Sequence, residues 1–168
     1  MHSVPLYIIW AEKSFFLKKS IYRNYFNSEC FYWIDAGFFH DTNMSRYLYN
    51  WPSYDKCKKD PRVIINLIRN ISNKEINNLK LFDNIEHEKF KHFPNVGDGL
   101  FGGKSDYLIR FIYLYYKTIK LFIRKKQFIG CDQNLYTYIS FFHKDIVNII
   151  YSKGNYHYFK FYLSSEYK

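Results

Sequence analysis

Apolar and aromatic runs alternate along this chain with polar, turn-forming segments, and the pattern predicts an alternation of strands and helices. Short apolar runs bounded by Asn, Ser, Asp, Gly or Pro are typical of buried strands. The expected strands are Leu6–Trp10, Phe31–Asp35, Val63–Ile68, Leu100–Phe101, Ile146–Tyr151 and Tyr156–Leu163. No internal repeat and no linker interrupts the pattern, so we expect a single domain over residues 1–168.

Helical spacing of apolar residues is clearest in the segment that begins at Ser105 or Asp106 and ends near Lys125. Its apolar residues fall on one face and its basic residues largely on the other, as expected of a helix packed on a core. The apolar set is Leu108, Phe111, Ile112, Tyr115, Ile119 and Phe122. A helix from Ser14 to Arg23, with Phe16, Leu17 and Ile21 inward, and a helix from Asp132 to Ile139 are also expected.

The order of these elements favours an α/β fold. A strand at Leu6–Trp10, a helix and a strand at Phe31–Asp35 predict a parallel, right-handed βαβ unit. Asn50–Pro61 is expected to be a polar loop, and an Asn- and Lys-rich stretch follows Val63–Ile68 to about Asn84.

Asp35 is the first candidate for chemistry, because it ends the apolar run Phe31–Ile34 and Gly37 follows it. Ligands of open α/β sheets bind just outside the carboxyl ends of strands. There Asp35 could hold a divalent metal beside a diphosphate, with Gly37 allowing close approach. The alternative is an Asp that only caps the next turn.

Two further segments combine glycine or carboxylate with a predicted helix start. Gly102 and Gly103 are expected to end a short strand, followed by Lys104, so that helix N–H groups and a positive dipole lie near the carboxyl edge of the sheet. The alternative is a turn that needs glycine for steric reasons. Asp132 and Gln133 begin a helix, where they could bind sugar hydroxyls or, for Asp132, act as an N-cap.

The net charge and the cysteine content limit which kinds of binding partner and which cellular compartment are expected for this protein. The net charge of +10 invites a polyanionic partner or reflects a Lys-rich solvated surface. Three widely spaced cysteines, an odd number, predict reduced thiols and a cytoplasmic protein. No signal peptide or transmembrane segment is evident, since the apolar stretch Tyr107–Ile123 carries charges. Association with a membrane surface is the alternative location.

Four short motifs occur in an order that resembles the HtrL/YibB family of glycosyltransferase-like proteins. They are Ile9-Trp10-Ala11-Glu12-Lys13, Phe31 to Phe38, Gly99-Leu100-Phe101-Gly102-Gly103 and Cys131-Asp132-Gln133-Asn134-Leu135. The resemblance runs from about Leu6 to the C-terminus, and it implies that residues 72–95 are a variable connection. It implies a GT-A-like mixed sheet flanked by helices, of which this chain would be the C-terminal portion, without the N-terminal nucleotide-binding part.

The resemblance implies transfer of a sugar from a nucleotide-sugar to a glycan or protein hydroxyl, assisted by Mn²⁺ or Mg²⁺. Asp132 and Gln133 would orient the donor sugar, and Gly102, Gly103 and Lys104 would face the donor. Asp35 would bind the metal, with His157 as a weaker metal-ligand candidate. Gly37 stands where a standard Asp-x-Asp motif has its second carboxylate.

Two other functions stay open at this stage. One is a truncated, inactive relative that serves as a partner subunit; self-association or a partner chain would then complete the sheet. The other is a basic module that binds RNA or a membrane surface. No DNA partner is expected.

Overall fold

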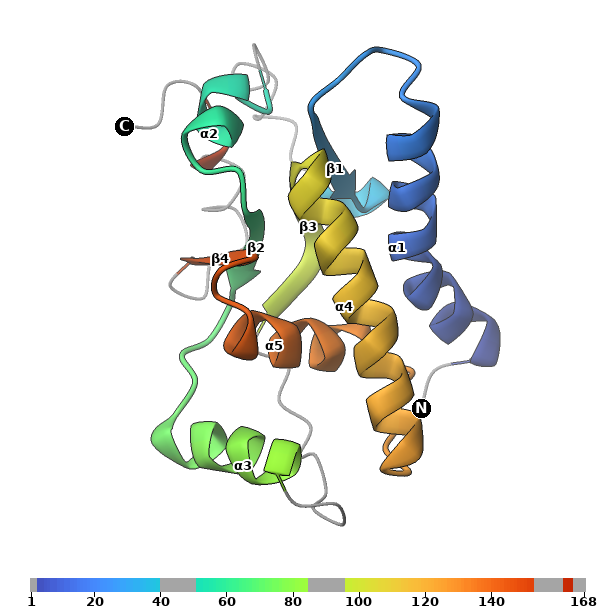
Figure 1. The fold of residues 1–168 in the computed structure, drawn as a ribbon, viewed down its shortest axis with the longest axis vertical. Helices are drawn as coiled ribbons and strands as arrows, with labels where there is room; N and C mark the ends of the chain where they lie inside the picture. Colours follow the sequence, from blue (N-terminus) through green and yellow to red (C-terminus); the bar gives the residue numbers. More distant parts are fainter. Residues whose placement is uncertain (1–2, 40–50, 85–95, 153–161, 165–168) are drawn as a thin grey trace.

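A mixed sheet with helices packed on it forms the framework of the computed structural model, which describes residues 3–39, 51–84, 96–152 and 162–164 (Figure 1). Within these residues the sheet has four strands in the order β1-β3-β2-β4. The strands are β1 (Cys30–Ile34), β2 (Val63–Leu67), β3 (Val96–Lys104) and β4 (Val147–Tyr151). The helices are α1 (Val4–Arg23), the short 3-10 helix η1 (Ala36–Phe39), α2 (Tyr54–Lys59), α3 (Asn73–Asn84), α4 (Ser105–Arg124) and α5 (Asp132–Phe142). The predicted mixed α/β class is confirmed.

Strand direction decides which residues share an edge of the sheet. β3 runs antiparallel to both β1 and β2, and β2 runs parallel to β4. β1, β2 and β4 therefore point the same way, and their carboxyl ends meet at the edge where β3 begins. Ile34 at the end of β1 pairs with Leu100, whereas Cys30 at its start pairs with Lys104.

The predicted strand at Leu6–Trp10 is wrong, because these residues belong to the 20-residue helix α1. The start signal lies further upstream: Ser3 is the extended N-cap, and Pro5 occupies the first turn, where its missing N–H costs nothing. Asn24, in the left-handed conformation with φ of 36°, ends the helix. The parallel βαβ unit is therefore also wrong, since β1 follows a helix and pairs antiparallel with β3.

Two segments expected to be loops contain helices. The expected loop Asn50–Pro61 includes α2, and the expected connection over residues 72–95 includes α3. α3 begins with a reciprocal capping box: the Ser72 N–H and hydroxyl both donate to Glu75 Oε2 at 2.7 Å, and the Glu75 N–H donates to the Ser72 hydroxyl. The Ser-x-x-Glu spacing of Ser72 and Glu75 is a sequence signal for a helix start, even though the segment is polar.

The C-terminal strand expected at Tyr156–Leu163 lies mostly outside the described residues. Within its range, Tyr162 and Leu163 are described, and they have helical and turn conformations instead of an extended one. The strands expected at Val63–Ile68 and Ile146–Tyr151 and the helices expected after Ser105 and Asp132 are confirmed within one to three residues of their ends.

β3 is longer than expected, because it continues through Gly102 and Gly103 to Lys104. A Cβ on Gly102 would lie 2.3 Å from the Phe31 carbonyl oxygen, and a Cβ on Gly103 would lie 2.6 Å from the Arg62 carbonyl oxygen. Glycine is thus required where neighbouring backbone approaches β3 closely. The two residues lie inside the central strand rather than in a turn that follows it.

The main core lies between the sheet and the helices α1, α4 and α5, which cover one face (Figure 1). Phe101 from β3, Phe111 from α4 and Tyr136 from α5 are fully buried and stack with ring centroids 5.1–6.0 Å apart. A smaller cluster on the other face contains Ile64 and Leu100. The predicted inner face of α4 is confirmed, apart from Ile119, which is half-buried.

α1 is apolar on two sides, and only one of them packs on the core. Leu17 is buried and Ile21 half-buried, whereas Phe16, expected to face inward, is 49% exposed. Val4, Ile8, Phe15 and Tyr22 are also exposed. Such a surface is compatible with the expected self-association, which stays a prediction. No helix in the described part of the chain is long and apolar enough to cross a membrane.

The Asp60 side chain links the turn that precedes β2 with strand β4. Its carboxylate accepts hydrogen bonds from the Arg62 backbone and guanidinium and, at 2.8 Å, from the Asn148 amide on β4. The Arg62 side-chain hydrogen bond is the main cause that holds the pKa of Asp60 below its usual range. The charged form of Asp60 therefore stabilises the folded chain.

We expect Asp60→Asn to lower the free energy of unfolding near pH 7 by about 1–3 kcal/mol, because it removes charge-assisted hydrogen bonds. The pKa of Asp60 is lower in the folded protein than in the unfolded chain. The stabilisation by the Asp60 carboxylate is therefore present above about pH 4, and it is lost as the pH falls through the pKa that Asp60 has in the folded protein. Urea denaturation of both proteins from pH 7 to 2.5 measures it. A difference between them that stays constant with pH would contradict this role.

The expectation of three reduced thiols is wrong, because Cys30 and Cys57 form a disulfide and Cys131 is free. The bond joins the start of β1 to α2 across a sequence separation of 27 residues. Sequence spacing hid this pair, because the two cysteines are far apart in the chain and meet only through tertiary structure.

Thiol titration of the unreduced, denatured chain should therefore find one thiol, Cys131, and titration after reduction should find three. Reduction should lower the free energy of unfolding by about 2–4 kcal/mol, because it releases a constraint on the unfolded chain. Urea denaturation with and without reductant tests this. The Cys131→Ser variant is the control, and it should show the same dependence on reductant.

Candidate functional site

Asp35 lies where the sequence placed it, directly after β1 at the carboxyl edge of the sheet. Side chains alternate along a strand, so Asp35 continues the row of Phe31 and Trp33, which pack against the helix-covered core. The Trp33 indole N–H donates to Asp35 Oδ1 at 2.7 Å, and the Asp35 N–H donates to the Gly99 carbonyl at 2.8 Å. Both the carboxylate and its backbone are therefore held in position.

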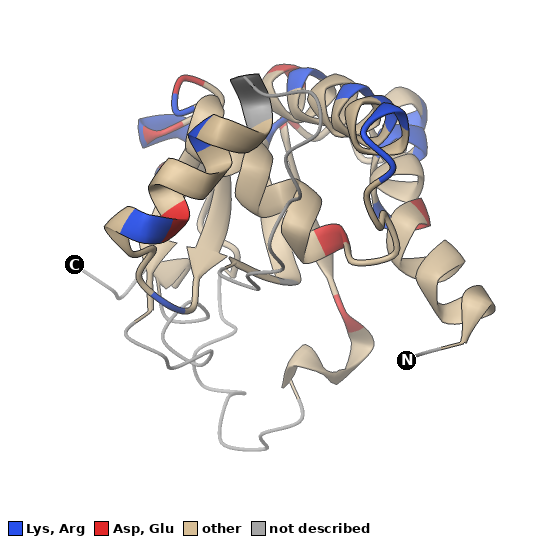
Figure 2. Cartoon of the chain, turned by 90° about the horizontal axis from the view of Figure 1, so that it is seen from below, with Lys and Arg blue, Asp and Glu red and all other residues tan. Residues whose placement is uncertain are grey.

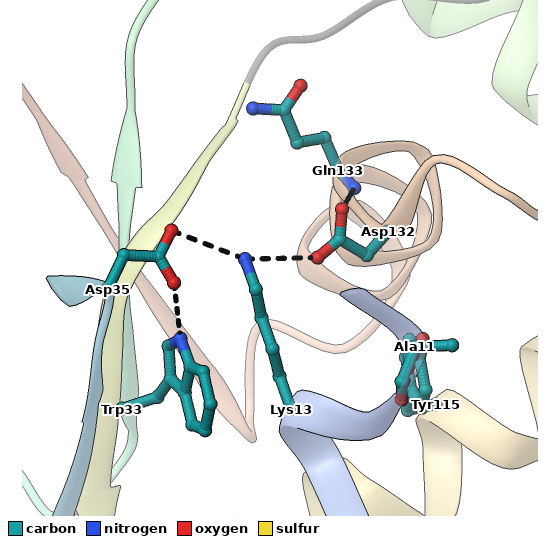
Figure 3. A network of polar contacts seen from close by, with 7 residues as sticks. All are labelled: Ala11, Lys13, Trp33, Asp35, Tyr115, Asp132 and Gln133. Carbon is teal, nitrogen blue, oxygen red and sulfur yellow. Dashed lines mark hydrogen bonds and ion pairs between the residues drawn. The ribbon is translucent and has the colours of Figure 1, made fainter. Parts of the chain in front are cut away.

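Asp132 reaches the same place from the other end of the chain, as the first residue of α5. It is 2% exposed, and its Oδ1 accepts the Gln133 backbone N–H at 3.1 Å. The capping position predicted for Asp132 is thus one residue off, because Cys131 is the N-cap. In Figure 3 the Gln133 side chain leaves α5 on the side that faces Asp35.

Lys13 joins the two carboxylates, and sequence reasoning missed it. Its ammonium lies 3.5 Å from Asp35 Oδ2 and 3.3 Å from Asp132 Oδ2, with one carboxylate on each side (Figure 3). Lys13 is 3% exposed and shares the inward stripe of α1 with Ser14 and Leu17. A lysine on the core-facing stripe of a helix was the available signal, but the wrong strand at Leu6–Trp10 concealed it.

The two carboxylates differ in solvent exposure. The side chain of Asp35 is 43% exposed, whereas those of Lys13 and Asp132 are both 3% exposed. Burial of an ion pair is tolerated only when each charge has a partner, so Lys13 and Asp132 depend on each other. Asp35 is the member of the group that a ligand can reach. Two carboxylates and one ammonium leave one formal negative charge in excess.

A divalent cation bound by Asp35 and Asp132 together does not fit this arrangement. Mg²⁺ needs oxygen ligands at about 2.0–2.1 Å, whereas here the Lys13 ammonium lies between the two carboxylates, 3.3 and 3.5 Å from their Oδ2 atoms, and would have to be displaced. The expected binding of a metal by Asp35, with His157 as a weaker ligand, stays a prediction. Within the described residues no group of three His, Cys, Asp or Glu side chains could hold a metal ion. His157 lies outside the described residues.

The remaining candidate residues do not join this group. Gly102, Gly103 and Lys104 lie toward the opposite edge of the sheet, where Lys104 pairs with Cys30 and its ammonium lies 3.9 Å from Glu29. The helix start that follows them therefore lies at the amino edge of β1, so its expected position at the carboxyl edge is wrong. Gly37 lies in η1, and a Cβ there would meet nothing within 4 Å.

We expect Lys13→Met to lower the free energy of unfolding by about 3–5 kcal/mol, because it leaves the buried Asp132 carboxylate without its cation. Adding Asp132→Leu should restore much of that loss, since both buried charges are then gone. Lys18→Met, on an exposed position of the same helix, is the matched control and should change stability by less than about 0.5 kcal/mol. Urea denaturation measures all four proteins. Equal effects of the two single substitutions would contradict the buried bridge.

Comparison with known proteins places the chain in one family. A family model described as "Bacterial protein of unknown function (HtrL_YibB)" matches residues 2–164. No curated protein and no solved structure matched the chain. The matched segment includes the three elements that carry Lys13, Asp35 and Asp132. The chain therefore belongs to the HtrL_YibB family.

Proposed function

We propose that this protein transfers a sugar from a nucleotide-sugar donor to a glycan or protein hydroxyl, and that its domain is a GT-A-like fold. One observation carries the proposal: Asp35 and Asp132, selected separately from the sequence as donor-site residues, meet at a single buried lysine. They come from elements almost a hundred residues apart, so their meeting is a property of the fold and not of local sequence.

The position of the group supports ligand binding. Asp35 follows β1 at the edge where the carboxyl ends of β1, β2 and β4 meet, which is the edge that ligands use in open α/β sheets. Gly99 lies beside the carboxylate: a Cβ there would lie 3.5 Å from Asp35 Oδ2 and 3.3 Å from the Phe38 ring. Glycine at this position avoids a close contact with the Phe38 ring and keeps a side chain away from the Asp35 carboxylate.

Each residue then has a distinct task. Transfer breaks the bond between the sugar C1 and the phosphate oxygen, forms a bond from C1 to the acceptor oxygen, and passes the proton of the acceptor hydroxyl to the departing diphosphate. Asp35, fixed by Trp33, accepts hydrogen bonds from sugar or acceptor hydroxyls. Lys13 holds Asp35 and Asp132 in fixed positions and supplies the local positive charge, while the Gln133 amide can bind a further hydroxyl. No step in this scheme passes through a metal ion.

The test is release of nucleoside diphosphate from a panel of nucleotide-sugars, with oligosaccharide and peptide acceptors. We expect Asp35→Asn to lower the rate at least about 100-fold, as loss of one positioned polar group at a reacting centre commonly does. Its stability should change little, because Asp35 is partly solvated. Asp145→Asn, which removes a carboxylate that is 68% exposed and paired with Arg110, is the matched control and should retain full activity.

Two outcomes would overturn the proposal: no release from any donor by the wild-type protein, or full activity of Asp35→Asn. Because Lys13 already lies between the two carboxylates, activity should persist in EDTA. Loss of activity in EDTA with recovery by Mn²⁺ would show that transfer is assisted by a metal ion.

A further inference from the structure

The groove between α4 and α5 lies apart from the carboxylate site and differs from it in charge. It has a volume of about 750 Å³. Lys117, Lys120 and Arg124 from α4 form one side, and Leu121, Tyr138 and Phe142 contribute apolar surface. No Asp or Glu is among its described lining residues. Figure 2 shows Lys and Arg gathered along α4, where acidic residues are sparse.

The three cations lie on one side of α4, because positions i, i+3 and i+7 of a helix fall close to one line. They extend over about 10 Å, from a rise of 1.5 Å per residue. All three are exposed, and none of them makes an ion pair with any residue in the described ranges. Elsewhere on the surface Arg62, Arg69 and Arg110 each contact a carboxylate. The α4 cations are therefore available to an external anion.

The apolar wall determines what kind of anion fits. Tyr138 is 7% exposed and packs on Phe142 with ring centroids 4.8 Å apart, so neither ring offers a free face for stacking a nucleotide base. Recognition of single-stranded nucleic acid depends on such faces. The parts of Leu121, Tyr138 and Phe142 that line the groove instead offer contact to a flexible apolar chain. A purely hydrophilic anion would leave this surface unused.

We propose that the α4–α5 groove binds an anionic amphiphile: a phosphate group on an alkyl or acyl chain. Lys117, Lys120 and Arg124 hold the phosphate, because clustered cations neutralise its charge and donate charge-assisted hydrogen bonds. Leu121, Tyr138 and Phe142 cover the chain. The ligand is taken up as a single molecule into the groove and not as part of a bilayer surface.

Calorimetric titration with decyl phosphate below its micellar concentration tests this on the full chain. We expect one site, with affinity at least about 30-fold lower in the triple variant Lys117→Gln, Lys120→Gln, Arg124→Gln, since each lost charge-assisted contact weakens binding several-fold. The matched control is Lys18→Gln, Lys19→Gln, Arg23→Gln on α1, which removes two lysines and one arginine and should bind as the wild type does. Thermal denaturation confirms that both variants are folded.

Four results would overturn the proposal. Equal loss of affinity in both triple variants would show that binding depends on the net charge of the protein and not on the cations of the groove. Equally tight binding of inorganic phosphate would show that the alkyl chain is not needed for binding. Equally tight binding of the neutral decyl maltoside would show that the phosphate is not needed. Binding to vesicles of phosphatidylglycerol but not to monomeric decyl phosphate would assign the cations to a membrane surface.

Discussion

The buried ammonium of Lys13 is the constraint around which the rest of the carboxylate site is arranged. A lysine that is 3% exposed is stable in the interior only if carboxylates replace the water it has lost. Asp132 supplies one, at 3.3 Å, and Asp35 supplies the other, at 3.5 Å. α1, the end of β1 and the start of α5 are therefore fixed relative to one another by one side chain, with Asp35 left partly open to solvent.

The central strand β3 provides the second constraint. Its glycines allow the backbones of Phe31 and Arg62 to approach at distances that no side chain would permit. This close packing sets the register of β1 against β3, and that register brings the end of β1 to Gly99. The glycines and the carboxylates thus act at opposite edges of the sheet. The glycines build the framework, and the carboxylates flank the buried lysine, with Asp35 as the accessible member of the group.

Charge is distributed unevenly over a chain whose net charge is +10. The site at the carboxyl edge carries an excess of carboxylate, while α4 carries three cations without carboxylate partners among the described residues. The hydroxyl groups of a donor sugar suit the first surface, and the phosphate of an anionic amphiphile suits the second. The two proposals rest on different residues, so either can fail without the other.

Local patterns in the sequence determined much of the fold. Apolar runs identified β1, β2 and β4, and helical spacing identified α4, because burial of one face leaves a direct periodic trace. Sequence also singled out Asp35 and Asp132, since each lies at the boundary of an element. It failed at Leu6–Trp10, where an apolar run is compatible with strand or helix and Ser3 with Pro5 decides for the helix. It failed at α3, where the family resemblance implied a variable connection, although the Ser72–Glu75 capping box is a local signal for a helix start.

Tertiary structure alone decided which of these residues meet. The pairing of β1 with β3, the bond between Cys30 and Cys57, and the position of Lys13 between two carboxylates all join residues far apart in the chain. Such contacts leave no periodic trace in a single sequence, because they depend on strand direction and helix placement. The sequence singled out Asp35 and Asp132 as candidate site residues, but not Lys13. The fold decided that Asp35 and Asp132 share a lysine, and that Lys104 lies at the other edge of the sheet.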